Sequence, residues 1–116
     1  MAVQIKRIYE PYAESDGYRV LVDRLWPRGI AKDKAHIDQW LKEVAPSTEL
    51  RQWFHHEDGK WHEFEARYRD ELKNSEALKE LADLAEMHKN LTLLYSAKDE
   101  KNNQAVVLQE LIKGQS

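Results

Sequence analysis

The chain has 116 residues, of which 41% are hydrophobic and 34% charged, with a net charge of −3 and no cysteine. The lack of cysteine excludes disulfides, thiolate metal sites and catalysis by a cysteine nucleophile. This length is typical of one domain, so we treat residues 1–116 as a single domain. The start has no apolar signal region, and the longest apolar run, residues 105–108, is far too short to span a membrane. These features predict a cytoplasmic protein without membrane contact.

Two strands are predicted near the start of the chain. Residues 2–9 have the composition of a strand, and Glu10-Pro11 ends it. Residues 18–25 contain a continuous apolar run, which is typical of a buried strand. The link between the two is too short for an ordinary parallel crossover. It therefore favours a hairpin, or two strands that are not neighbours.

Helical patterns fill the middle and the end of the chain. Asp33, Ser47 and Ser75 each precede an apolar stripe at helical spacing and are suited to cap a helix. The five predicted helices cover residues 33–44, 47–54, 61–72, 75–85 and 103–112.

A third strand is predicted over residues 91–95, between the last two helices. The long helical crossover that joins it to the second strand makes that pair parallel and right-handed. The predicted fold class is α/β: a small three-layer-like domain, with a short, mostly parallel three-stranded sheet flanked by about five helices.

Residues 23–29 (DRLWPRG) follow the second strand and carry the most informative side chains. In open α/β sheets, ligands bind beyond the carboxyl ends of the strands. Arg24 and Arg28 offer donors suited to a carboxylate or a phosphate, and Trp26 offers a stacking face. The alternative is structural, with Arg24 paired to an internal carboxylate and Trp26 in the core.

Residues 95–99 (YSAKD) occupy the corresponding place after the third strand. Tyr95, Ser96 and Lys98 can line the same site, at the start of the last helix, where free N–H groups favour an anion. If the chain is an enzyme, Asp23 is the candidate general acid or base and Tyr95 the candidate proton donor. That pair suits hydrolase or lyase chemistry with a bound water.

The histidines and acidic residues between positions 55 and 63 do not form a recognised metal motif. His55 and His62 are separated by the Asp58-Gly59 break, and the H-E-x-x-H pattern is absent. Ser47 could be a nucleophile with His55 as its base, but a role as a helix cap explains the position of Ser47 better. We therefore predict no metal site and no cofactor.

Four segments form a recognisable pattern over most of the chain: residues 18–29, 46–54, 61–68 and 91–99. They resemble the YeaO-like family of uncharacterised proteins, whose domain has no known function. Longer relatives have an aspartate–arginine pair after one strand, as in Asp23-Arg24, and a cysteine–histidine–arginine stretch after another. Here the corresponding residues are Asn102-Asn103-Gln104. The relatives also have a helix between the first two strands, which by analogy makes the first strand parallel.

The sequence favours binding of a small anionic molecule, bearing phosphate or carboxylate, at the carboxyl ends of the strands. The expected ligand-binding residues are Arg24, Trp26, Arg28, Tyr95, Ser96 and Lys98. Two alternatives remain open. One is a nucleic-acid-associated or transcription-regulatory protein with a local basic face. The other is an interaction module that forms a homodimer through exposed aromatic residues. The sequence leaves both a monomer and a homodimer open.

Overall fold

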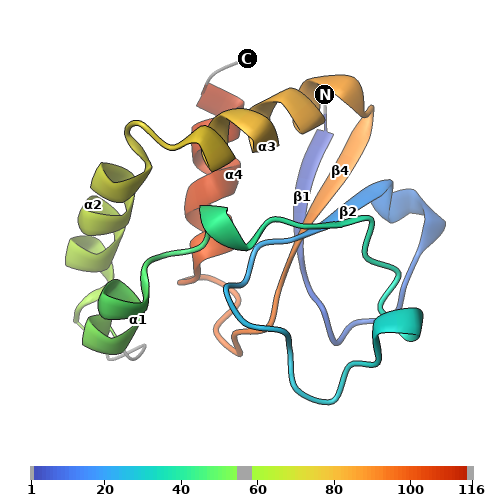
Figure 1. The fold of residues 1–116 in the computed structure, drawn as a ribbon, viewed down its shortest axis with the longest axis horizontal. Coiled ribbons are helices and arrows are strands. Elements are labelled where there is room, and N and C mark those ends of the chain that lie inside the picture. Colours follow the sequence, from blue (N-terminus) through green and yellow to red (C-terminus); the bar gives the residue numbers. More distant parts are fainter. Residues whose placement is uncertain (1, 55–58, 115–116) are drawn as a thin grey trace.

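The protein, represented by a computed structural model, is described for residues 2–54 and 59–114. Its strands are β1 (Ala2–Arg7), β2 (Tyr18–Leu21), β3 (Gln39–Trp40) and β4 (Asn90–Tyr95). They form one sheet in the order β1-β4-β2-β3, and every described pair is parallel (Figure 1). The carboxyl ends of the strands therefore share one edge of the sheet.

The fourth strand corrects the predicted three-stranded sheet. β3 lies where the sequence pattern predicts the first helix, and the backbone N–H groups of Asp38 and Leu41 donate to carbonyl groups of β2 at 2.9 Å. The apolar residues of this segment fit helical spacing, but they divide between the two faces of the sheet. Ile37 and Trp40 pack on one face, and Leu41 and Val44 on the other. Periodicity alone does not distinguish these arrangements in a short run.

β1 is parallel to β4, with Ala2 opposite Asn90 and Arg7 opposite Tyr95. The hairpin between the first two strands is therefore wrong, whereas non-adjacent parallel strands are correct. Because β4 lies between β1 and β2, the segment that joins β1 to β2 has to pass β4. It contains only a short 3-10 turn, Glu14–Asp16.

The described residues contain four α-helices, one fewer than predicted: α1 (Thr48–Phe54), α2 (Trp61–Leu72), α3 (Glu76–Met87) and α4 (Gln104–Gly114). Two predicted caps are confirmed, because the hydroxyls of Ser47 and Ser75 each accept an N–H from three residues later at 3.1 Å. None of these helices has the length and apolar character that crossing a membrane requires.

All four helices pack on one face of the sheet, where α4 runs back opposite to β4 (Figure 1). The main core joins apolar side chains of every helix to alternate residues of the strands, among them Val3, Val20, Leu91 and Leu93. Burial of this apolar area is the principal force that holds the helices to the sheet.

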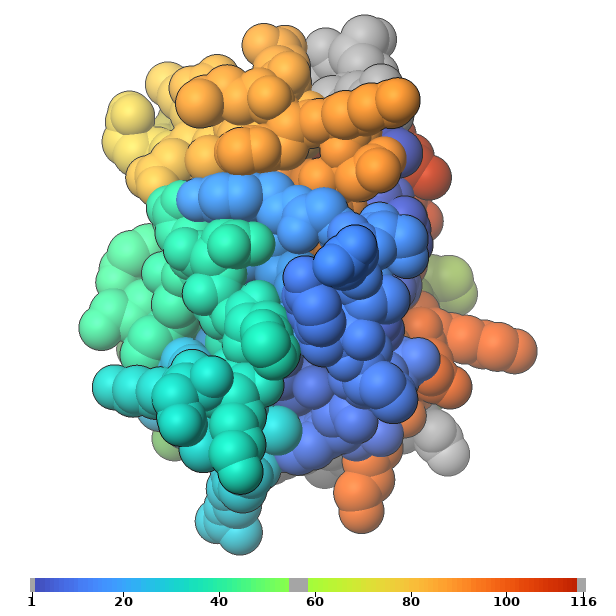
Figure 2. Space-filling model, turned by 90° about the vertical axis from the view of Figure 1, so that its right-hand side faces the viewer, coloured from blue at the N-terminus to red at the C-terminus, as the bar shows by residue number. Residues whose placement is uncertain are grey.

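The opposite face carries a smaller cluster of Ile8, Leu21 and Leu94. Irregular chain covers it, because Trp26 and Trp40 pack against it together with Ile30 and Ile37. The predicted third layer is thus built of loop and not of helices. Figure 2 shows this side of the molecule, where the segment after β1 (blue) lies beside the segment that follows β2 (cyan to teal).

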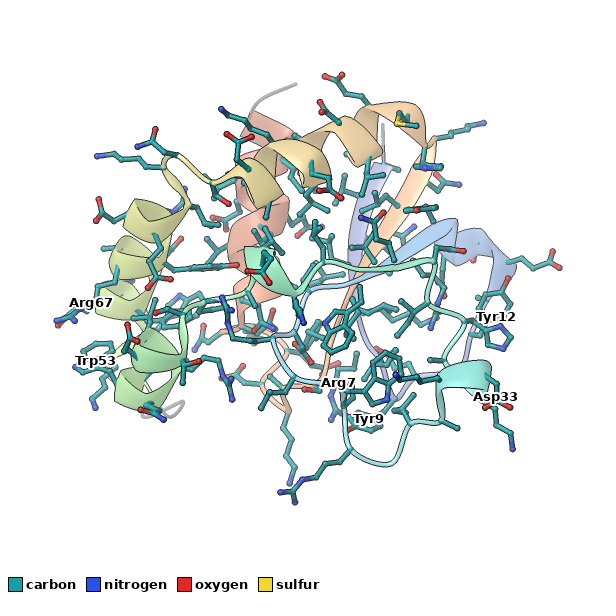
Figure 3. The ribbon with its side chains drawn as sticks, viewed as in Figure 1. Arg7, Tyr9, Tyr12, Asp33, Trp53 and Arg67 are labelled. Carbon is teal, nitrogen blue, oxygen red and sulfur yellow. The ribbon has the colours of Figure 1, made fainter. Side chains whose placement is uncertain are left out.

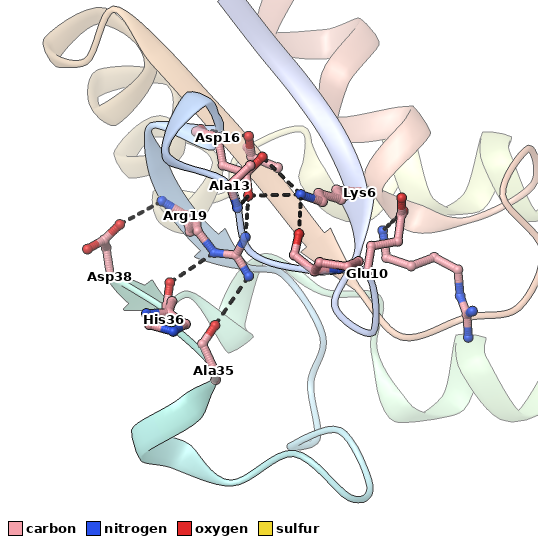
Figure 4. Close-up of polar contacts among 11 residues, drawn as sticks. Lys6, Glu10, Ala13, Asp16, Arg19, Ala35, His36 and Asp38 are labelled. Atoms are coloured by element: carbon pink, nitrogen blue, oxygen red, sulfur yellow. Dashed lines mark hydrogen bonds and ion pairs between the residues drawn. The ribbon is translucent and has the colours of Figure 1, made fainter.

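A buried carboxylate joins these two segments to the sheet (Figure 4). Asp16 accepts hydrogen bonds from Lys6 Nζ at 3.0 and 3.1 Å, from the Ala13 N–H at 3.2 Å, and from the guanidinium of Arg19. Arg19 is buried as well and also donates to the carbonyl groups of Ala35 and His36, at 3.2 and 2.9 Å. Burial raises the pKa of Asp16, but these three donors outweigh burial and hold it below its ordinary value.

Gly17 follows this carboxylate and is required by its surroundings. Its φ is +69°, and a Cβ at this position would lie 2.2 Å from the carbonyl oxygen of Asn90. The close approach lets the turn pack directly against the start of β4.

We expect Asp16→Ala to lower the free energy of unfolding by about 3–5 kcal/mol, because it leaves the buried Arg19 without its counterion. Urea denaturation measures the change. The control is Asp70→Ala, which removes a 3.9 Å pair to Lys73 between side chains that are both 78% exposed. Its effect should stay within about 0.5 kcal/mol. Equal losses in the two variants would contradict a central role for Asp16.

Gly17→Ala should destabilise the fold by about 3 kcal/mol or more, because the backbone conformation and the contact with Asn90 both oppose a side chain. Gly29→Ala is the matched variant: its φ is also positive, at +78°, but a Cβ there has no neighbour within 4 Å. It should cost only about 1 kcal/mol. Thermal melting compares the two, and a Gly17 variant as stable as the Gly29 variant would contradict the close packing.

Candidate functional site

A cavity of about 350 Å³ opens at the carboxyl ends of β2 and β4. The two strand ends are held together by a 3.0 Å hydrogen bond from the Val22 N–H to the Leu94 carbonyl. The cavity collects side chains from the segments after β2 and β4, from the approach to α1, and from α1, α2 and α4. The residues that line it are Asp23, Arg24, Leu25, Ala45, Pro46, Arg51, Phe54, Phe64, Ser96, Ala97, Asn103 and Gln104.

Asp23 is the most buried ionisable group of the cavity, with 7% of the residue exposed. Its Oδ1 accepts a 2.5 Å hydrogen bond from Gln104 Nε2, and its backbone carbonyl accepts one of 2.7 Å from Trp40 Nε1. Its Oδ2 is buried and has no hydrogen-bond partner among the described residues. Such an oxygen is unusual, because buried polar atoms are nearly always paired.

Burial raises the pKa of Asp23 above its ordinary value. The hydroxyl of Ser96, the amide of Gln104, the backbone N–H of Ser96 and the positive charge of Arg51 each counteract this effect without cancelling it. The carboxyl group therefore retains its proton to a higher pH than an exposed aspartate does.

Arg24 serves mainly to shape the cavity. Its Nε and Nη2 donate to the carbonyl groups of Pro46 and Ala45, at 3.0 and 3.1 Å. These bonds fix the segment that leads into α1. The structural alternative from the sequence was a carboxylate partner, whereas the observed partners are backbone carbonyls.

Arg51 is an exposed residue of α1 whose guanidinium makes no hydrogen bond or ion pair with any residue in the described ranges. It is close enough to Asp23 for its charge to lower the pKa of that carboxyl group. The sequence pattern did not single it out. The sequence did contain a signal: Arg51 lies one helical turn after the Ser47 cap, and this position directs its side chain back toward the strand ends.

Two aromatic contacts support α1 from outside (Figure 3). The guanidinium of Arg67 lies 4.4 Å from the centre of the Trp53 ring, and Lys60 Nζ lies 5.0 Å from the same ring. Because Trp53 is on α1 and Arg67 on α2, this arrangement fixes the helix that carries Arg51.

Asn103 and Gln104 complete the polar wall. Asn103 is fully buried, caps α4 by accepting the Val106 N–H at 3.1 Å, and donates to the Asp99 carbonyl at 2.8 Å.

The rest of the lining is apolar. Phe54 and Phe64 stack with their ring centres 4.2 Å apart, and Leu25 is 62% exposed at the rim. A second cavity, of about 280 Å³, shares Leu25 and Arg51 with the first. The site is therefore elongated, with Arg51 between its two parts.

Arg7 fixes the end of β4 that contributes Ser96 and Ala97. Its Nε donates to the Ala97 carbonyl at 2.9 Å and its Nη2 to the Ser96 carbonyl at 3.4 Å. The guanidinium lies 5.1 Å from the centre of the Tyr9 ring (Figure 3). The first strand, at the edge of the sheet, thus positions one wall of the cavity.

The structure brings together three of the predicted site residues, Asp23, Arg24 and Ser96, but Trp26, Arg28, Tyr95 and Lys98 do not line the cavity. Trp26 donates to the Ile30 carbonyl at 2.7 Å and packs edge-on to Trp40. Arg28 and Lys98 are exposed. The ligand-binding roles of these four residues stay predictions.

Tyr95 belongs to the main core and is 2% exposed. Burial raises the pKa of its hydroxyl, with smaller contributions from Glu100 and Glu10. Because the cavity contains Asp23 but not Tyr95, nothing in its lining supports the two acting together as acid and base.

The acidic and histidine cluster falls partly outside the described residues, which do not include positions 55–58. Within residues 2–54 and 59–114, no group of three or more histidine, cysteine, aspartate or glutamate side chains is placed to hold a metal ion.

Comparison with known proteins gives a family without an assigned activity. The family model described as the inactive DUF488-N3 subclade matches residues 2–116. The chain is 50% identical to the uncharacterised protein YeaO of Escherichia coli strain K12, over 97% of this chain and 98% of that protein. It is 43% identical to uncharacterised proteins of Mycobacterium tuberculosis and Mycobacterium bovis, over 97% of this chain and 94% of each. No solved structure matches it.

These matches extend over nearly the whole chain, and they include the strand ends and the α4 start that form the cavity. The chain belongs to the YeaO-like family, in the subclade of DUF488-N3 domains described as inactive.

Proposed function

We propose that the cavity at the strand ends binds a small anionic molecule. The observation that carries this proposal is the guanidinium of Arg51, which has no partner among residues 2–54 and 59–114 and lines a cavity with the buried Asp23 and Asn103. A guanidinium without a protein partner offers its donors to a carboxylate or phosphate. The volume of about 350 Å³ is at the lower end of the range for small-molecule sites, which suits a metabolite and not a polymer.

The proposal is binding without turnover. The described lining has no histidine, lysine or cysteine, and the ionisable group beside Ser96 is the carboxyl group of Asp23, whose raised pKa makes it harder to ionise. The matching subclade is described as inactive, and the family resemblance implies that Asn102-Asn103-Gln104 replaces the cysteine–histidine–arginine stretch of longer relatives. Hydrolase or lyase chemistry therefore has less support than a binding role.

The two other functions receive no comparable support. The exposed aromatic residues make contacts within the chain, since the Tyr9 hydroxyl donates to the Arg28 carbonyl at 2.9 Å and Tyr12 stacks on His36. A cytoplasmic location remains part of the proposal, because a chain without cysteine suits a reducing compartment.

We expect Arg51→Ala to weaken binding of phenylpropionate, a carboxylate with an aromatic body, by about tenfold or more, because one charge-assisted hydrogen bond is lost. NMR titration of isotope-labelled protein measures the affinity and locates the site. Arg28→Ala removes an exposed arginine that does not line the cavity and should leave the affinity unchanged. If Arg28→Ala abolishes binding and Arg51→Ala does not, the anion binds at the loop of residues 23–29 and the cavity assignment is wrong.

Asp23→Asn should stabilise the protein near neutral pH by roughly 1 kcal/mol, as expected where a functional group is kept at a cost to the fold. The pKa of Asp23 is raised in the folded state. The free energy of unfolding therefore falls as the pH rises from 3.8 through that raised pKa, and the fall is complete above it. Asparagine does not titrate and can still accept from Gln104.

Urea denaturation as a function of pH tests this stability change. The advantage of Asp23→Asn should shrink as the pH is lowered through the same window. Asp33→Asn, at an exposed position, should give no such pH-dependent difference. A variant at position 23 that is less stable than the wild type at neutral pH would show that the carboxylate is structural.

A further inference from the structure

The buried Oδ2 of Asp23 limits what the cavity can hold. Asp23 is 7% exposed, and this oxygen has no hydrogen-bond partner among the described residues. The amide of Gln104 is committed to Oδ1, at 2.5 Å. Ser96 lies near the carboxyl group, but neither its hydroxyl nor its N–H makes a hydrogen bond of ordinary geometry to Oδ2. A ligand that supplies an O–H or N–H donor would satisfy the oxygen.

Arg51 is the complementary open group. Its guanidinium and the carboxyl group of Asp23 line the same cavity, yet no ion pair joins them. Arg51 is exposed, whereas Oδ2 is buried, so the two groups border one cavity without pairing across it. A molecule with an acceptor at one end and a donor close to it would bridge the two.

The remaining lining favours an apolar body on that molecule. Phe54, Phe64, Pro46 and Leu25 form one side of the cavity, and Leu25 also borders the second cavity. Burial of apolar surface against these residues would add affinity that is independent of the two polar contacts.

We propose that the ligand is a hydroxy acid or amino acid with an apolar side chain. Its carboxylate binds Arg51, its hydroxyl or ammonium group donates to Asp23 Oδ2, and its side chain packs on Phe54 and Phe64. This inference rests on the proposed function and adds to it the requirement for a donor. An anion without a donor would leave Oδ2 unsatisfied and bind more weakly.

Four probes with one phenyl skeleton separate these contributions. Phenylpropionate carries only the carboxylate, phenyllactate adds a hydroxyl, phenylalanine adds an ammonium group, and phenylethylamine has the ammonium group without the carboxylate. NMR titration gives each affinity. We expect phenyllactate or phenylalanine to bind about tenfold or more tightly than phenylpropionate, and phenylethylamine to bind weakly.

Asp23→Asn should abolish the advantage of the donor-bearing probes over phenylpropionate, measured in the same variant, because its amide meets their donors with another donor. Asp23→Ala repeats the test without any polar group, with a thermal melt to establish that it is folded. Asp33→Asn removes an exposed carboxylate and should preserve the advantage.

The outcomes distinguish this inference from the function on which it rests. If phenylpropionate binds through Arg51 but neither donor-bearing probe gains, the donor requirement is wrong and anion binding stands. The requirement is also wrong if the gain persists in both variants at position 23. If no carboxylate binds at the cavity, the proposed function fails and the donor requirement fails with it.

Discussion

The fold depends on one buried carboxylate that three parts of the chain share. Asp16 accepts from Lys6 on β1 and from Arg19 on β2, and Arg19 in turn holds the carbonyl groups of residues 35 and 36. β1 and β2 are not neighbours, so no backbone ladder joins them directly. Removing one partner of a buried ion pair leaves the other charge buried without compensation, which is strongly destabilising. The cluster thus ties β1 and β2 to each other across the strand that lies between them.

The same strand order determines where chemistry can occur. With every described pair parallel, the ends of β2 and β4 meet at one edge, and Asp23 and Ser96 arrive there together. Arg7, at the end of β1, then holds the carbonyl groups of the segment after β4. A cavity built at a shared strand edge needs little from any single segment.

Local patterns predicted the parts of the fold that local interactions determine. The caps at Ser47 and Ser75, the helix of residues 61–72 and the third strand follow from spacing and turn chemistry over a few residues. The helix expected from Asp33 failed because its apolar residues divide between two sheet faces, which only the pairing with β2 determines. The site divides in the same way. Asp23, Arg24 and Ser96 follow from the rule on strand ends, whereas Arg51 enters from a helix distant in sequence.

Arg24 and Arg51 differ in what they contribute to the cavity. Two nitrogens of Arg24 donate to backbone carbonyl groups, so Arg24 stabilises the walls of the cavity whether or not a ligand is bound. Arg51 makes no hydrogen bond or ion pair in the described part of the chain, and a buried oxygen without a partner there, such as Asp23 Oδ2, weakens the fold. A ligand that contacts Arg51 and Oδ2, as proposed above, would offset this cost, whereas Arg24 would keep its bonds to the two carbonyl groups.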